Sequence, residues 1–351
     1  MKKINVILAL LILFFSCKKD SQEDIDIKPG PAGFVNGVFI VNEGNFGSNQ
    51  GDVSYIGSNG SIINEMYFEN NNVVLGDVLQ SFSVIGSKGY AVVNNSSKIE
   101  VVDMANFGHL ATIANVDYPR YLLPVNSTTA YLTSGSMSGQ VKVLDLNTNT
   151  FTNSIAVGNG PDHLIMANNR VFVCNNGGFL SDSTLSVINT ATHSLEASIE
   201  VGDMPNNIVK DAIGHLWVLC SGKTIYDVSW NVIGNSAAEL FEIDPVSLAV
   251  VGQYPIGQLG DHPTKMAVSS SGSEIYFENH GVYHFNINQP GTFDLIISGD
   301  HGALGVHPNT DHLWVGSVSN FTSGDTIFEY NGPVLMHHYL AGVGANSIVF
   351  N

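Results

Sequence analysis

Basic residues are scarce in this 351-residue chain. It contains 13 Lys and Arg residues against 31 Asp and Glu residues, which gives a formal net charge of −18 at pH 7. Loss of Lys2 and Lys3 with an amino-terminal signal would take this charge to −20 (−18 − 2). Nucleic-acid binding depends on clustered Lys and Arg side chains that neutralise phosphates. We therefore expect no nucleic-acid partner.

Cysteine is also rare, with three residues in the chain. We expect Cys17 to carry a membrane anchor, for the reasons given next, which leaves Cys174 and Cys220. When the internal repeats described below are aligned, these two residues lie one position out of phase and therefore on opposite faces of their strands. We expect two small buried side chains rather than a disulfide.

The amino-terminal apolar run is too short to span a membrane as a helix. Residues 4–15 form an apolar stretch of about a dozen residues after Lys2 and Lys3, the pattern of a secretory signal. Ser16-Cys17 ends it and resembles a lipobox, although Phe14 stands where such boxes usually carry Leu. The resemblance implies a signal peptide over residues 1–17 and acylation of Cys17. Secretion without lipidation is the alternative.

Residues 18–34 are expected to form a flexible tether. Five of their first seven residues are charged and this stretch leans acidic, and Pro29 and Pro31 follow in a linker-like stretch. The charged part resembles the export tags that move some lipoproteins to the outer face of the outer membrane. This predicts a protein of a Gram-negative cell surface that touches the membrane through its lipid only. A solvated tether without an address is the alternative.

After the signal, no stretch has a convincing helical periodicity of 3.6 residues. The 36 glycines favour many short strands joined by tight turns. A short apolar stretch that ends in Asp or Asn before a turn recurs at spacings of 42, 44, 55, 42 and 45 residues. The copies end at Asp103, Asp145, Asn189, Asp244, Asn286 and Asn331, and a degenerate first copy ends at Gly57.

Seven copies at this spacing predict an all-β, seven-bladed β-propeller over residues 35–351. A second series of apolar strands confirms the count, one before each copy. Residues 345–350 form a lone strand at the carboxyl terminus, which we expect to complete the first blade and remove an exposed sheet edge. The longest insertion, Ser221–Ala237, explains the spacing of 55 residues.

The repeat Val201-Gly202-Asp203-Met204-Pro205-Asn206-Asn207-Ile208, followed by Leu216-Trp217-Val218, resembles the YVTN or YncE-like propeller family. The opening run 38–47, VFIVNEGNFG, is similar to that of surface lipoproteins of the BtuG type. That resemblance implies capture of a small nutrient, with vitamin B12 or another corrinoid as the best candidate. It also implies a TonB-dependent outer-membrane transporter as the partner. No cofactor is implied, since a corrinoid would be a ligand.

The loops between the second and third strands of the blades carry several aromatic residues and a Met among Gly, Ser and Asn. In a propeller these loops open on the same face as the connections between blades, around the central channel. Large rigid side chains on such loops supply contact area at low entropic cost. The alternative is that they fold back over the sheet rims. The candidate contact residues are Phe46, Met137, Phe179, Tyr226, Trp230 and Phe321.

The connections between blades contain a second set of candidates. Asp-His pairs recur there, and the histidines are His163, His262 and His301, with Arg120 as the one arginine near this face. A ring of Asp residues at this position would hydrogen-bond backbone amides in a structural role. The functional alternative is that these side chains bind a polar ligand. No spacing matches a recognised zinc or calcium site.

Enzymes share the propeller scaffold, so the fold does not select among functions. A calcium-dependent lactonase would need carboxylate and amide side chains that converge on the channel, and Glu43, Asn94, Asn175, Asn279 and Asp203 could form such a set. A role in turn formation explains most of these residues equally well. No nucleophile elbow or phosphate loop is present in the sequence. We predict a binding protein, with a lactonase-type or lyase-type enzyme and a glycan or protein adhesin as alternatives.

Overall fold

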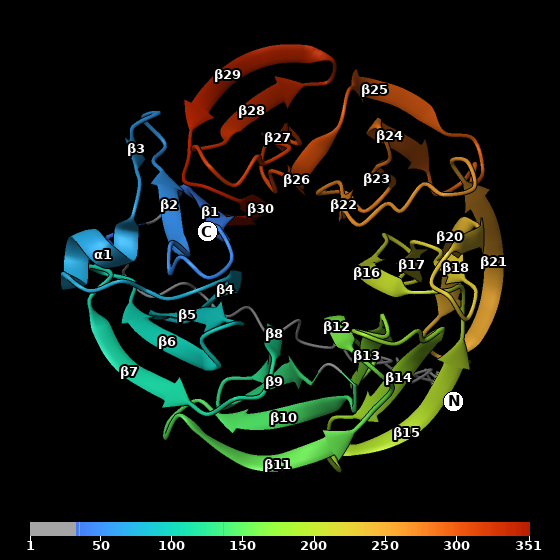
Figure 1. Cartoon of the computed structure of the whole chain (residues 1–351), viewed down its shortest axis with the longest axis horizontal. Helices are drawn as coiled ribbons and strands as arrows, with labels where there is room; N and C mark the ends of the chain where they lie inside the picture. The colour runs from blue at the N-terminus through green and yellow to red at the C-terminus, as the bar shows by residue number, and fades with distance from the viewer. Residues whose placement is uncertain (1–32, 35, 136) are drawn as a thin grey trace, which may run out of the picture.

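The computed structural model describes residues 33–34, 36–135 and 137–351. They form seven four-stranded antiparallel sheets arranged around a central axis, which confirms the predicted seven-bladed propeller (Figure 1). We number the blades in chain order from the sheet that contains β1. The predicted acylation site Cys17, the predicted signal peptide and most of the predicted tether lie outside the described residues. No helix in the described part of the chain is long and apolar enough to cross a bilayer.

The strand boundaries follow the repeat. The first strands, nearest the axis, of blades 1 to 7 are β30 (Ala345–Phe350), β4 (Leu79–Ile85), β8 (Pro119–Asn126), β12 (Pro161–Ala167), β16 (Pro205–Lys210), β22 (Met266–Val268) and β26 (His301–Val306). The second strands are β1 (Val38–Asn42), β5 (Lys88–Val93), β9 (Thr129–Ser134), β13 (Arg170–Asn175), β17 (Leu216–Cys220), β23 (Glu274–Glu278) and β27 (Leu313–Ser317).

The third strands are β2 (Asp52–Ile56), β6 (Lys98–Asp103), β10 (Gln140–Asp145), β14 (Thr184–Asn189), β20 (Ala238–Asp244), β24 (Gly281–Asn286) and β28 (Thr326–Asn331). The outer strands are β3 (Ile62–Ile63), β7 (His109–Ala114), β11 (Thr150–Ala156), β15 (Ser194–Glu200), β21 (Ala249–Ile256), β25 (Asp294–Ser298) and β29 (Val334–Leu340). The insertion after Cys220 folds as a separate hairpin of β18 (Thr224–Tyr226) and β19 (Val232–Asn235).

The repeated Asp or Asn is the last residue of the third strand in blades 2 to 7, and in blades 2 to 6 its side chain caps the turn that follows. The Oδ1 atom of Asp145 accepts the backbone N–H of Asn147 at 2.8 Å and that of Thr148 at 3.2 Å. Asn189 does the same with Ala191 and Thr192. These local bonds turn the chain into the outer strand.

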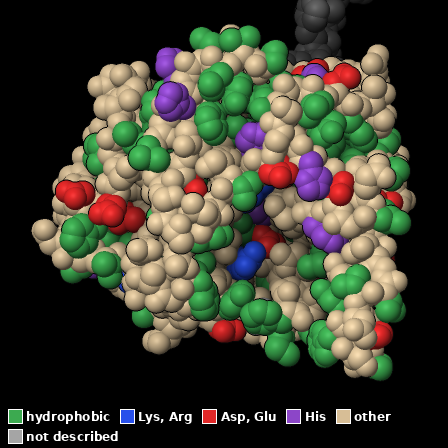
Figure 2. Space-filling model, turned by 45° about the horizontal axis from the view of Figure 1, so that its top comes forward, with side chains coloured by type: hydrophobic (Ala, Val, Ile, Leu, Met, Phe, Trp, Pro, Cys, Tyr) green, Lys and Arg blue, Asp and Glu red, His purple; other side chains and the backbone are tan. Residues whose placement is uncertain are grey.

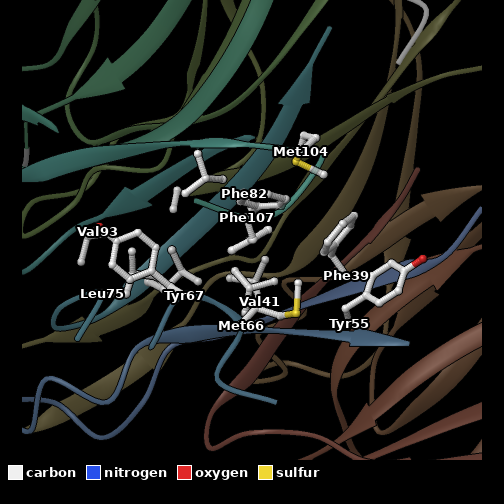
Figure 3. Close-up of a cluster of buried hydrophobic side chains, with 14 residues drawn as sticks. Phe39, Val41, Tyr55, Met66, Tyr67, Leu75, Phe82, Val93, Met104 and Phe107 are labelled. Carbon is white, nitrogen blue, oxygen red and sulfur yellow. The ribbon is translucent and has the colours of Figure 1, made fainter. Parts of the chain in front are cut away.

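The carboxyl-terminal strand closes the ring as predicted. β30 pairs antiparallel with β1, with Ile348 opposite Ile40. The two faces of β1 then pack against different neighbours, Val38 and Ile40 toward blade 7 and Phe39 and Val41 toward blade 2. Figure 3 shows the second of these clusters, in which Phe39 lies beside Phe82 and Phe107. Every inter-blade contact of this kind buries apolar side chains from both blades.

Apolar packing between neighbouring blades also explains where the two cysteines lie. Cys174 and Cys220 are both free and buried, as predicted, and belong to one apolar cluster between blades 4 and 5. They are one position out of phase, since Asn175 and Cys220 hold equivalent positions opposite Pro161 and Pro205. Opposite faces of neighbouring blades are the faces that meet, so the phase difference brings both thiols into one interface. Burial raises the pKa of both thiols well above its ordinary value.

One short helix departs from the predicted all-strand pattern. α1 (Met66–Asn71) follows the two-residue strand β3 and covers the outside of blade 1, where Met66 and Tyr67 are buried. The carboxylate of Asp52 accepts the backbone N–H groups of Tyr67 at 2.8 Å and Phe68 at 3.2 Å. Burial raises the pKa of Asp52 to about 6, although these hydrogen bonds lower it. A helix of six residues is too short to produce a periodic sequence pattern.

Candidate functional site

The central channel opens into a polar cavity of about 310 Å³ on the face that carries the connections between blades, here called the loop face. The opposite face, with the tight turns between first and second strands, is called the turn face. Figure 2 shows a central hollow with basic and acidic side chains in it. The cavity is lined by Glu43, Gln80, Arg120, Tyr121, Asp162, His163, Asn176, Met204, Asn206, Ser221, Thr264, Lys265 and Asn346. Six of the seven blades therefore contribute to it.

A repeated feature of the first strands aims these side chains at the axis. Pro119, Pro161 and Pro205 open the first strands of blades 3 to 5, and Pro263 precedes that of blade 6. The pairing register shifts directly after the three strand-opening prolines, so a bulge interrupts the ladder there. Bulges re-aim side chains and recur beside functional sites. The two residues after each of the four prolines include most of the cavity lining contributed by these blades.

Arg120 and Asp162 form the main ion pair of the cavity. Their Nη2 and Oδ2 atoms lie 2.6 Å apart, and the Asp162 side chain is only 4% exposed. His163 Nδ1 lies 3.0 Å from the other carboxylate oxygen, and the Asn176 amide donates to Asp162 Oδ2. Burial alone would raise the pKa of Asp162, but Arg120 and His163 outweigh burial and hold it at about 2. Asp162 is therefore ionised at neutral pH and keeps Arg120 in place.

A second chain of polar contacts crosses the ring closure. The Nζ atom of Lys265 donates to the backbone oxygen of Asn346 at 2.8 Å and also to its side-chain oxygen. The Asn346 amide in turn donates to Glu43 Oε1 at 2.8 Å. Burial lowers the pKa of Lys265 and raises that of Glu43, and the opposite charge of each counteracts the shift of the other. Groups with perturbed pKa values often gather at functional sites.

Tyr121 and His163 form the floor of the cavity. Their rings are 3.8 Å apart between centroids, and Gln80 Nε2 donates to the Tyr121 hydroxyl at 3.2 Å. Burial raises the pKa of Tyr121 strongly, so the hydroxyl stays protonated. Both residues, with Lys265 and Asn346, also line a second hollow of about 310 Å³ deeper in the channel. These four side chains therefore separate the loop-face cavity from the rest of the channel.

Besides Nδ1 of His163, which lies 3.0 Å from a carboxylate oxygen of Asp162, two buried polar atoms in the cavity have no hydrogen-bond partner among the described residues. They are Nε of Arg120, a donor, and Oδ1 of Asn206, an acceptor. Asn206 is 8% exposed, and its amide nitrogen is used by the Pro263 carbonyl at 3.1 Å. Buried polar groups are satisfied in the great majority of cases. An acceptor on a ligand would satisfy the first atom, and a donor on a ligand would satisfy the second.

The six candidate contact residues on the loops are exposed to solvent and do not fold back over the sheets. Their exposed fractions are 82% for Trp230, 75% for Phe46, 70% for Phe179, 58% for Met137, 50% for Tyr226 and 42% for Phe321. Trp230 sits at the tip of the β18–β19 hairpin beside Tyr226, with ring centroids 6.0 Å apart. Asp227 Oδ1 fixes this tip by accepting the backbone N–H groups of Ser229 and Asn231.

The three predicted Asp-His pairs occupy different registers and do not form one ring. Asp162 and His163 follow Pro161, whereas Asp261 and His262 precede Pro263. His301 pairs with Ser317 and thus takes the place of the proline itself. The cavity therefore contains Arg120 and His163 but neither His262 nor His301.

The two outlying histidines have local roles instead. His262 contacts the Ser221 carbonyl at 3.0 Å and the Thr224 hydroxyl at 3.2 Å, at the base of the β18–β19 hairpin. The backbone N–H of His301 donates to Glu278 Oε1 at 3.4 Å, and burial lowers the pKa of the His301 imidazole. His280 lies between Asp261 and Asp300, 2.7 Å from the second. The sequence patterns did not single out His280 or Lys265, although Lys265 lies two residues after Pro263, as His163 lies two residues after Pro161.

Most of the residues considered for a lactonase-type centre are occupied elsewhere. The side-chain amides of Asn94 and Asn279 donate to the Pro119 carbonyl and to Asp261, and Asp203 pairs with Lys223 at 2.9 Å. Asn175 donates to hydroxyl groups of its own blade. Of the five residues, Glu43 alone lines the cavity.

One group in the described part of the chain has the spacing of metal ligands. Ligand atoms of Asp211, His215 and Glu242 lie within 4.8 Å of one another on the turn face. Asp211 already accepts the Trp217 indole N–H at 2.9 Å and the backbone N–H groups of Ile213 and His215. This arrangement caps the turn before β17 and leaves little free ligand capacity on Asp211.

Larger hollows lie away from the axis. One of about 610 Å³ on the turn face is lined by turn residues such as Asn168, Ile213 and Val246. Another of about 460 Å³ lies between blades 7 and 1 beside α1. Neither brings together oppositely charged, buried groups from many blades as the central cavity does. We therefore take the central cavity and its rim as the candidate site.

Comparison with known proteins assigns the chain to a family. Residues 36–331 match the family described as "Domain of unknown function (DUF5074)". The chain belongs to this family. No curated protein matches the sequence.

Solved structures of distant proteins have the same fold as this chain. A quinoprotein alcohol dehydrogenase-like protein from Bacteroides thetaiotaomicron has a TM-score of 0.65 and 15% identity, over 90% of this chain and 78% of that one. A functionally unknown protein from Desulfotomaculum acetoxidans has a TM-score of 0.63 and 14% identity, over 90% and 98%. Hydrazine synthase from Kuenenia stuttgartiensis has a TM-score of 0.60 and 16% identity, over 75% and 86%. At these identities the likeness concerns the propeller fold, and the resemblance to YncE-like and BtuG-type propellers stays a prediction.

Proposed function

We propose that this propeller is a binding protein that captures a small ligand on its loop face. The observation that carries the proposal is the combination of a charged, pre-organised cavity with six exposed large side chains on the surrounding loops. Ligand sites typically place a few converging polar groups among apolar and aromatic contacts. A closed ring holds these groups in position before binding, so little conformational entropy is lost when a ligand arrives.

The polar part of the cavity favours a neutral amide-bearing or zwitterionic group. Arg120 is already neutralised by Asp162, and Lys265 lies near Glu43, so no strong net charge is left for a simple ion. The open positions are the donor on Arg120 and the acceptor on Asn206. Amide groups present a carbonyl and an N–H side by side and so complement both.

A corrinoid is the best candidate ligand, since its ring is apolar and its periphery carries amides. It would be too large to enter the cavity whole and would lie across Phe179 and Trp230 with one amide arm toward Arg120. The similarity of the opening run 38–47 to BtuG-type lipoproteins supports the same ligand. We further propose that acylated Cys17 holds the protein on the outer membrane, where it hands the ligand to a TonB-dependent transporter. The chain would then work without catalysis and without a cofactor.

Isothermal titration of the full-length protein with cyanocobalamin tests the ligand directly. We expect saturable heat at micromolar protein. Absence of heat would overturn the corrinoid assignment. Turnover of a lactone that stops with a chelator would favour an enzyme instead, and retention on a glycan or protein array would favour an adhesin.

A further inference from the structure

Blades 5 and 7 share a constellation of side chains on the turn face. Each second strand begins at the Leu of a His-Leu-Trp run, His215-Leu216-Trp217 in blade 5 and His312-Leu313-Trp314 in blade 7. The tryptophan pairs with a glutamate of the third strand, Glu242 or Glu329. A tyrosine of the outer strand follows, Tyr254 or Tyr339, at the same register.

In blade 5 this constellation is complete within the chain. His215 Nδ1 lies 2.6 Å from Glu242 Oε1, and the Trp217 ring stacks on Tyr254 with centroids 5.6 Å apart. The buried indole N–H donates to the carboxylate of Asp211 at 2.9 Å. Asp211 is the residue whose N–H bonds the carbonyl of His215 in the turn between the strands.

Blade 7 repeats the frame with two differences. His312 Nδ1 lies 2.7 Å from Glu329 Oε1, and Trp314 stacks on Tyr339, again at 5.6 Å. The place of Asp211 is taken by His307, whose N–H bonds the carbonyl of His312. The place of Gly252, opposite the glutamate, is taken by His337, whose Nδ1 lies 3.0 Å from Glu329 Oε2.

The consequence of the first difference is an unpaired indole. Trp314 is 4% exposed, and its Nε1 has no hydrogen-bond partner among the described residues. The nearest carboxylate in sequence, Asp311, is used by Ser270 of the neighbouring blade. Trp314, the three histidines and Glu329 line a cavity of about 280 Å³. The residue that carries the unpaired indole N–H therefore lines a space large enough to hold an acceptor group.

The ionisable side chains of the two blades differ as well. Blade 5 holds two carboxylates and one imidazole, whereas blade 7 holds one carboxylate and three imidazoles. His307 Nδ1 accepts the N–H of Asn309 at 3.2 Å, which leaves its Nε2 as a second donor. A negatively charged acceptor placed beside Trp314 would restore the composition that blade 5 has by itself.

We infer that the blade 7 cavity binds a small oxyanion, such as a carboxylate, in the position that Asp211 fills in blade 5. The Trp314 indole and the His307 imidazole are its donors, and His312 faces it as His215 faces Asp211. The site lies on the turn face between blades 7 and 1, away from the loop-face cavity. It is therefore independent of the proposed ligand capture, and failure of either proposal leaves the other standing.

The three indole N–H resonances of the full-length protein, from Trp217, Trp230 and Trp314, provide the test. Sodium acetate, phosphate and sulfate are titrated separately against chloride at equal ionic strength, with resonances assigned from single Trp→Phe variants. We expect a saturable shift of the Trp314 resonance and none of the Trp217 resonance, whose acceptor is in place. The oxyanion that saturates at the lowest concentration identifies the class as carboxylate, phosphate or sulfate.

The matched variant is His307→Asp, which gives blade 7 the carboxylate of blade 5. It should abolish the oxyanion response and place the Trp314 resonance near its oxyanion-bound position without any added anion. If that variant does not fold, Trp314→Phe provides the second measurement, since it should remove the thermal stabilisation that the oxyanion gives the wild type. No saturable Trp314 shift with any of the three anions, or a response unchanged in either variant, would overturn the inference.

Discussion

This propeller has two kinds of aromatic side chain, those buried between blades and those exposed on loops. Trp217 is fully buried between blades, where its ring stacks on Tyr254, whereas Trp230 is 82% exposed at a hairpin tip. Burial of an apolar ring stabilises the fold, and an exposed ring contributes little to folding. An exposed ring beside a cavity can instead supply contact area to a ligand.

Trp230→Ala should therefore weaken ligand capture without weakening the fold. We expect about a 30-fold loss of affinity, equivalent to roughly 2 kcal/mol, because aromatic contact residues are common hot spots. The unfolding free energy should change by less than about 0.5 kcal/mol. Titration calorimetry and thermal unfolding measure the two effects. Phe179→Ala is the parallel variant, and unaltered affinity in both would contradict the assigned rim.

The ion pair of Arg120 with Asp162 should make the stability of the fold depend on pH. The pKa of Asp162 is lowered from 3.8 to about 2 in the folded protein, so the pair stabilises the fold fully above pH 4. This stabilisation, about 2 kcal/mol, is lost as the pH falls from about 4 to about 2.

Asp162→Asn should cost about 2 kcal/mol or more at pH 7, because it leaves the Arg120 charge without its partner. Urea unfolding of both proteins at pH 7 and pH 3 checks this, and the difference should narrow at the lower pH. Asp294→Asn is the control, since the Asp294 side chain is 76% exposed. A difference that grows on acidification would contradict the assignment of the ion pair.

Among the helices and strands, those that recur from blade to blade could be predicted from the sequence, whereas those that occur once in the first blade could not. The last residues of the third strands of blades 2 to 6 follow from a turn that each Asp or Asn caps itself, so these strands can be predicted locally. Helix α1 and the two-residue strand β3 occur once, in the degenerate first blade, and leave no period. The Asp-His pairs suggested a false repeat because the register of each first strand is set by its proline and bulge, not by the pair.

The closing strand β30 allows a test within one sheet. Ile348 is 9% exposed and packs in the cluster between blades 7 and 1, so Ile348→Ala should cost about 2 to 4 kcal/mol. Ile63 on the outer strand β3 of the same blade is 39% exposed, and Ile63→Ala should cost less than about 0.5 kcal/mol. Equal effects of the two substitutions in denaturant unfolding would contradict closure by β30.

At the scale of the whole molecule, the site depends on contacts between distant parts of the chain. Lys265 meets Asn346 across 81 positions, and Asn346 meets Glu43 across 303. These contacts exist only because the ring closes between β30 and β1. Arg120 and His163 could be predicted from the repeat, whereas Lys265, Asn346 and Tyr121 required the closed ring and the bulges that direct side chains to its axis.

The proposed anchor makes a prediction about the whole protein in its cell. Cys17→Ala should release the chain from the membrane fraction into the soluble fraction, because several acyl chains on one cysteine give stable anchoring and a tether alone gives none. Cys220→Ala, which leaves Cys17 in place, should stay with the membrane. Detergent phase partition of both variants measures this, and membrane retention of Cys17→Ala would contradict lipidation at this residue.

The central claim is that ligand is captured on the loop face. Hydrogen exchange of the full-length protein with and without cyanocobalamin tests it most directly, because exchange is measured on all backbone amides at once. We predict slower exchange in the loops 42–51, 175–183 and 221–237 and unchanged exchange in the turns of the opposite face. Protection confined to the turn face, or no protection at saturating ligand, would contradict it.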